Sequence, residues 1–113
     1  MNTLKFEEDI YTKQIEERRC GGPETAILYN NRGHTRYLLV EFDAAVEDYN
    51  EAIRRNPKLA VAYYNRGTVL YRLGQFPEAL SDMNKATSLE PLNPEFRQGL
   101  EECRKAMNHT SNT

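Results

Sequence analysis

The chain has 113 residues, the length of one ordinary domain, and 39% of them are hydrophobic, which allows a modest core. A formal net charge of −2 without a basic stripe argues against a nucleic-acid-binding protein. No stretch approaches the ~18 consecutive apolar residues of a membrane span. The N-terminus turns acidic at Glu7, Glu8 and Asp9, unlike a secretory signal or a transit peptide. We therefore expect a cytoplasmic protein.

The first predicted helix covers residues 3–19. Leu4, Tyr11 and Ile15 recur at helical spacing, so one face of this segment is apolar. The Cys-Gly-Gly-Pro sequence at 20–23 breaks the helix, because glycine and proline disfavour helix interiors. The segment 1–20 is therefore predicted to stand apart from the central part of the chain.

Two copies of one sequence make up the centre of the chain. Residues 26–59 and 60–93 align without a gap at an offset of 34, and 13 of the 34 positions are identical. Each copy places Gly and Ala twelve residues apart, which lets two antiparallel helices approach closely. The small residues are Gly33 and Ala45 in the first copy and Gly67 and Ala79 in the second. We predict helices near 25–39, 43–56, 59–73 and 77–90.

Glycine and proline support these predicted helix boundaries. Pro57 and Pro91 cannot continue a helix. Gly74 suits a left-handed helix stop, and Pro77 suits the first turn of the next helix, where its missing N–H has no partner to lose.

The C-terminal part is predicted to hold one more helix, at 94–107. Apolar residues recur on one face of it, at Phe96, Leu100, Cys103 and Met107. Such a helix covers the last apolar surface of a stack of repeats. Residues 108–113 are polar and are predicted to be disordered.

The repeated pattern of aromatic, Gly, aromatic, Ala, aromatic, Ala and Pro over 34 residues resembles the tetratricopeptide repeat (TPR). The chain departs from it where Arg32 and Arg66 replace the usual Leu, and where Val40 replaces the Gly of the turn. The resemblance implies an all-α fold, a short TPR solenoid of antiparallel helix pairs in a right-handed superhelix. It also implies that residues 1–20 are a degenerate half repeat, which leaves an open N-terminal edge for a partner or a second copy.

The resemblance further implies that the first helix of each pair lines a concave groove that binds a partner. The inward positions are rich in amides and aromatic rings. They are Ile27, Asn30, Asn31, His34 and Leu38 in the first copy and Val61, Tyr64, Asn65, Thr68 and Arg72 in the second. Asn31 and Asn65 could hold a peptide backbone or merely bridge adjacent repeats, and the sequence leaves both open.

Each copy also contains a candidate ion pair. Asp48 and Asp82 lie sixteen residues after Arg32 and Arg66, so an Arg on the first helix is predicted to face an Asp on the second. Because a half-buried guanidinium needs a carboxylate partner, we expect these pairs to be structural.

The sequence shows no pattern of catalytic chemistry. It has no HExxH, phosphate-loop or CxxC motif and no Ser-His-Asp set. His34 and His109 sit in unrelated contexts, and Cys20 and Cys103 are predicted to be free thiols. We therefore expect a non-enzymatic protein without a cofactor or metal.

The sequence is compatible with three roles in binding, none with nucleic acid or a membrane. The leading prediction is a scaffold or adaptor that holds a peptide or helix of a partner protein in the groove. A second is a co-chaperone that clamps the acidic tail of Hsp70 or Hsp90. By resemblance such a clamp uses an Asn, kept as Asn31, and a Lys and an Arg where Val61 and Asn65 stand. A third is a structural subunit of a larger helical assembly.

Overall fold

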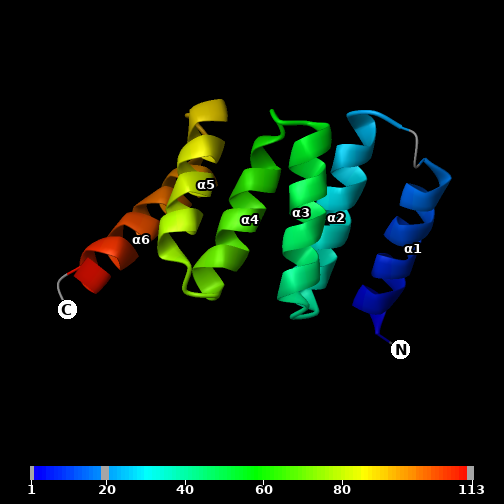
Figure 1. The fold of residues 1–113 in the computed structure, drawn as a ribbon, viewed down its shortest axis with the longest axis horizontal. Helices are drawn as coiled ribbons and strands as arrows, with labels where there is room; N and C mark the ends of the chain where they lie inside the picture. Colours follow the sequence, from blue (N-terminus) through cyan, green and yellow to red (C-terminus); the bar gives the residue numbers. More distant parts are fainter. Residues whose placement is uncertain (1, 19–20, 112–113) are drawn as a thin grey trace. The chain divides into compact units, whose positions relative to one another are not determined.

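A computed structural model of the chain describes residues 2–18 and 21–111. All regular secondary structure in these ranges is helical, in six α-helices (Figure 1). The helices belong to two compact units, Met1–Leu59 and Ala60–Thr113. None of the described helices is both long enough and apolar enough to span a membrane.

The first unit contains α1 (Thr3–Glu17), α2 (Glu24–Leu38) and α3 (Phe42–Arg55). Helix α2 packs against both α1 and α3. Its close contact with α3 depends on Gly33, because a Cβ there would lie only 2.7 Å from Cε1 of Tyr49. Tyr49 is fully buried, and so are three alanines of the same two helices, Ala26, Ala45 and Ala52. Small residues thus let a large ring fill the space between two adjacent helices.

The second unit contains α4 (Ala60–Arg72), α5 (Phe76–Leu89) and α6 (Pro94–Ser111), and α5 packs against both neighbours. One core cluster joins Ala79 and Met83 of α5 to Leu100 and Cys103 of α6. A second cluster is built from Ala60, Ala86 and Phe96. Three helices therefore share the buried apolar surface of this unit.

The ends of the four central helices lie within one residue of the predicted boundaries. Pro77 occupies the first turn of α5, and Gly74 has φ +78°, the left-handed conformation that the sequence predicts for it. Val40 takes the corresponding place between α2 and α3 with φ +63°. A β-branched residue is strained in this conformation, because its Cβ crowds the backbone.

The prediction for the C-terminal tail is wrong for residues 108–111, which continue α6 as far as Ser111. Ala106 and Met107 are half-buried, and His109 lies in a groove with Tyr71 and Phe76. These contacts outweigh the weak helix propensity of the polar residues. Helix α1 ends at Glu17, where the predicted helix runs to residue 19, and Arg18 caps it. Residue 19, Cys20 and residues 112–113 lie outside the described residues.

The strain at Val40 predicts the effect of replacing it. Val40→Gly should raise the free energy of unfolding by about 1 kcal/mol, because glycine relieves the left-handed strain while the valine side chain is exposed and adds little packing. Thermal and urea denaturation followed by circular dichroism measure this. Gly74→Val is the mirror experiment and should lower stability by a similar amount. An unchanged or lowered stability for Val40→Gly would contradict the assignment of strain.

Candidate partner-binding surfaces

A groove of about 670 Å³ lies in the second unit. Its apolar lining comes from Tyr71 at the end of α4, Phe76 at the start of α5 and Ala106 of α6. The two rings have centroids 5.3 Å apart. The polar lining comes from α6, at Glu102, Lys105 and His109. The groove thus combines an aromatic floor with charged and hydrogen-bonding groups along one helix.

A smaller hollow of about 100 Å³ adjoins this groove, with Tyr71 and Glu102 lining both. Tyr64 and Thr68 of α4 line it, two turns and one turn before Tyr71 on the same face of the helix. Gly99 of α6 closes it, because a Cβ there would lie 3.1 Å from Cε1 of Tyr64. The glycine therefore lets α6 approach α4.

The predicted groove residues of the second copy separate into two groups. Tyr64 and Thr68 line the smaller hollow, and Tyr64 also packs on Phe96, with ring centroids 4.9 Å apart. Val61, Asn65 and Arg72 are not among the residues that line either hollow. Val61 instead packs against the apolar cluster around Phe96.

Sequence reasoning missed the contribution of α6, which it treated only as a cap. The spacing of Glu102, Ala106 and His109, at i, i+4 and i+7, was the available signal, since it places them on one face.

The outer side of α6 carries mainly charged side chains. Its hollow with α5, of about 480 Å³, is bordered by the charged side chains of Arg97, Glu101 and Arg104. This polar face is what the end of a repeat array requires.

In the first unit, four of the five predicted residues form a partly exposed stripe on α2. Ile27, His34 and Leu38 are exposed and Asn31 is half-buried. Asn30 differs from the expectation, since only 7% of it is exposed. It follows the spacing of Ala26 and Gly33, which marks the buried side of α2 and not its outer side.

Both repeats contain the Arg–Asp pair that their sequences predict. Nε and Nη2 of Arg32 donate to the two carboxylate oxygens of Asp48, at 2.9 and 2.7 Å. Arg66 binds Asp82 in the same bidentate way, with both distances 2.8 Å. Both aspartates are buried. The hydrogen bond to the carboxylate raises the pKa of Arg32 and of Arg66.

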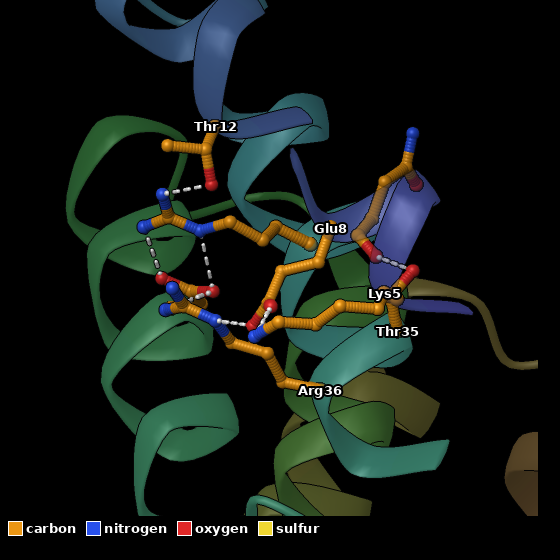
Figure 2. A network of polar contacts seen from close by, with 8 residues as sticks. Lys5, Glu8, Thr12, Thr35 and Arg36 are labelled. Carbon is orange, nitrogen blue, oxygen red and sulfur yellow. Dashed lines mark hydrogen bonds and ion pairs between the residues drawn. The ribbon is translucent and has the colours of Figure 1, made fainter. Parts of the chain in front are cut away.

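In the first unit the pair belongs to a larger network that includes α1 (Figure 2). Nη1 of Arg32 donates to Oγ1 of Thr12 at 3.2 Å. Arg36 bridges two carboxylates, with Nε 2.8 Å from Glu8 and Nη1 3.1 Å from Asp48. Charged groups from three helices therefore meet at one buried place.

Glu8 connects α1 to this network. Its carboxylate also accepts a hydrogen bond from Lys5 at 2.6 Å. Burial acts to raise the pKa of Glu8, but the hydrogen bonds from Lys5 and Arg36 outweigh burial and lower the pKa to about 2. The position equivalent to Arg36 in the second repeat is Leu70, so the second repeat has no arginine to bridge two carboxylates at this position.

Other chemistry has little support in the described residues. Within them, no group of His, Cys, Asp and Glu side chains could hold a metal ion. Cys103 is a free, buried thiol, and burial raises its pKa. A raised pKa disfavours the thiolate that nucleophilic chemistry needs.

The ion pairs generate a stability prediction. Arg66→Ala should lower the free energy of unfolding by about 2 kcal/mol, because it leaves the buried Asp82 without this partner. The loss should be less than the ~3–5 kcal/mol of a fully buried pair, since Arg66 itself is partly exposed. Arg72→Ala, an exposed arginine on the same helix, is the control and should change stability less. The double variant Arg66→Leu with Asp82→Leu should recover much of the loss in chemical denaturation. A double variant as unstable as Arg66→Ala would contradict the pairing.

The Glu8 network generates a pH prediction. Because the pKa of Glu8 is lowered from its ordinary 4.5 to about 2, its stabilisation is complete above 4.5 and is lost as the pH falls toward 2. Glu8→Gln should therefore cost roughly 2 kcal/mol at pH 7 and flatten the loss of stability between pH 5 and about 2.5. Urea denaturation at several pH values across this range measures the free energy of unfolding of both proteins. Glu17→Gln, at an exposed position at the other end of α1, is the control and should show the same pH dependence of stability as the wild type. A pH dependence for Glu8→Gln that runs parallel to that of the wild type would refute the prediction.

Comparison with known proteins places the chain in a family. Residues 41–74 match a family model described as TPR repeat, and residues 60–93 match one described as tetratricopeptide repeat. The first TPR of Spaghetti (RPAP3), solved bound to the HSP90 peptide SRMEEVD, is 30% identical, with 89% of this chain and 77% of that chain covered and a TM-score of 0.80.

Two further solved structures are comparably similar. The Arabidopsis OM64 TPR domain is 30% identical, with 87% and 78% of the two chains covered and a TM-score of 0.80. The first TPR domain of human RPAP3 is 29% identical, with 94% and 80% covered and a TM-score of 0.83. Together with the six helices and the two 34-residue repeats, these matches show that the chain belongs to the tetratricopeptide-repeat family and is an all-α TPR solenoid.

Proposed function

We propose that the chain is a non-enzymatic scaffold or adaptor that binds a peptide or helix of a partner protein. The observation that carries the proposal is the groove of the second unit, where an aromatic floor lies beside the charged side chains of α6. Apolar lining with a few convergent polar groups is the usual character of a binding site. The similarity to TPR domains solved with bound peptides supports this role. The composition of the chain favours action in the cytoplasm.

In this proposal the groove supplies two kinds of contact. The rings of Tyr71 and Phe76 take an apolar side chain of the partner, because aromatic rings bury much area at a low entropy cost. Lys105 and His109 carry donors that can reach the partner's carbonyl or carboxylate oxygens. Asn31 and Asn65 remain candidates for additional backbone contacts or for contacts between repeats.

A second candidate is the recognition of an acidic chaperone tail. Similar TPR domains favour it, since the second TPR domain of human RPAP3 was solved with the HSP70 peptide SGPTIEEVD and the TPR2B domain of yeast Sti1 in a complex with pHsp70. The sequence opposes it, because Val61 and Asn65 stand where the clamp has cations. Each missing charged hydrogen bond removes ~1.5–3 kcal/mol of binding free energy. A third role, as a subunit of a larger assembly, would use the N-terminal edge.

Selection of peptides from a random displayed library on the purified chain tests the leading proposal. We expect an enriched motif whose binding, measured by fluorescence anisotropy, weakens about tenfold in Lys105→Glu, since a charged contact is worth about 1.4 kcal/mol or more. Arg104→Glu is the matched control, because Arg104 borders the outer hollow of α6 and not the groove. An absence of enrichment, or equal loss in both variants, would contradict a peptide-binding groove.

The peptide SRMEEVD separates the two binding roles. We expect it to bind far more weakly than a selected peptide, because Val61 and Asn65 cannot supply the two positive charges of a clamp. Binding as tight as that of the selected peptides, with loss in Asn31→Ala, would favour the chaperone-tail role. Co-purification of one stoichiometric complex through the N-terminal edge would favour the structural role.

A further inference from the structure

Helix α1 has the smaller share of the apolar contacts in its unit. Among the described helices it packs against α2 alone. Its buried residues are Ile15 and Glu8, and Leu4 and Tyr11 are half-buried. The contact between α2 and α3 instead encloses the whole ring of Tyr49. Apolar burial therefore holds α3 on α2 more firmly than it holds α1 on α2.

The polar network of this unit consists of two separable sets of hydrogen bonds (Figure 2). Within the first set, Asp48 of α3 accepts from Arg32 and Arg36, which both belong to α2. The second set leads to α1. In it, Nε of Arg36 donates to Glu8 at 2.8 Å. Nη1 of Arg32 donates to Thr12 at 3.2 Å. Each arginine therefore uses different N–H groups for α1 and for α3.

Because the two sets are separate, α1 can leave α2 without stranding a buried charge. Arg32 would keep its bidentate bond to Asp48, and Arg36 would keep its bond of 3.1 Å to the same carboxylate. Glu8 would enter water together with Lys5, which lies on the same helix and donates to it at 2.6 Å. The large cost of breaking a buried ion pair comes from a charge left unpaired in the interior, and the release of α1 leaves none of these charges in that state.

Helix α1 should lose its helical structure when it leaves α2. It has 15 residues, and an isolated helix of about this length is marginal in water. The nearest charge outside the network is Glu41, in the turn between α2 and α3, which interacts with both Lys5 and Glu8. Since it attracts the one and repels the other, Glu41 adds little to the attachment of α1. Undocking and unfolding of α1 are therefore expected to be one event.

Arg55 of α3 determines where the released segment would end. Its Nη1 donates to the carbonyl oxygen of Gly21 and to Oγ1 of Thr25, both at 2.9 Å. Thr25 is buried at the start of α2 and itself donates to the carbonyl oxygen of Gly22 at 2.7 Å. These contacts hold the start of α2 on α3 without any part of α1, so an opening that begins in α1 should stop before Gly21.

We propose that α1 is a latch, which leaves α2 and unfolds as one unit while α2 and α3 stay paired, and that the bond between Arg36 and Glu8 sets how often it opens. Cooperative opening of one element in an otherwise native chain is a common property of folded proteins. Opening uncovers the N–H groups that Arg32 and Arg36 use for α1, so these donors meet another acceptor only in the open state. The inference is independent of the proposed function, because it does not involve the groove of the second unit.

Hydrogen exchange of individual amides in the full chain, measured by NMR at several urea concentrations below the unfolding transition, tests the proposal. We expect the amides of α1 to exchange through an opening that is more frequent than that of α2 and α3 and depends less on urea, because it exposes less surface. Amides of α1 that match those of α2 and α3 in both respects would show that α1 opens only in global unfolding. Amides of α1 without protection would show that it is not docked. Either result would overturn the proposal.

Two variants separate the latch from the rest of the unit. Glu8→Gln should speed exchange in α1 about tenfold or more, because it weakens a charged hydrogen bond, and Glu17→Gln is the matched control that should leave α1 unchanged. Ala52→Gly, at a buried position of α3, should speed exchange in α3 about fivefold through its lower helix propensity and leave α1 unchanged. Equal acceleration of α1 and α3 in Ala52→Gly, or unchanged exchange of α1 in Glu8→Gln, would contradict an independent latch.

Discussion

Each repeat depends on one close contact between its two helices, where a glycine faces an aspartate. A Cβ at Gly33 would lie 3.2 Å from Cβ of Asp48, and one at Gly67 would lie 3.1 Å from Cβ of Asp82. This approach brings the carboxylate within reach of the arginine that precedes the glycine. The two helices of a repeat are thus joined by close packing and by a bidentate ion pair at the same level.

Helix α1 of the first unit and helix α6 of the second unit are held to their neighbouring helices by different interactions. Helix α1 buries Ile15 and the carboxylate of Glu8, and Leu4 and Tyr11 are half-buried, so its attachment combines apolar contact with buried charge. Helix α6 buries Phe96, Leu100 and Cys103 and relies on apolar contact. Charged attachment depends on pH and on both partners being present, whereas apolar attachment depends mainly on shape and area. The two ends of the chain should therefore respond differently to acid.

Helix α6 presents two different faces. Its outer face carries Arg97, Glu101 and Arg104, which suit the solvated end of a repeat array. Its inner face carries Lys105 and His109 into the groove with the aromatic floor. One helix can line both hollows because residues three and four apart share a face, while adjacent residues point in different directions.

The sequence alone determined the repeat, the helix boundaries and the Arg–Asp pairs, because each is encoded by local spacing: a 34-residue period, glycine and proline at helix ends, and a fixed separation of opposite charges. Tertiary structure decided the rest. It buried Asn30, which follows the spacing of Ala26 and Gly33, and it extended α6 past Met107. It also joined Lys5, Glu8 and Arg36 into one network and gave α6 a side of the groove. These features depend on which residues far apart in sequence come into contact. Helical spacing shows that Asn30, or Glu102, Ala106 and His109, share a face, but it does not show what that face contacts.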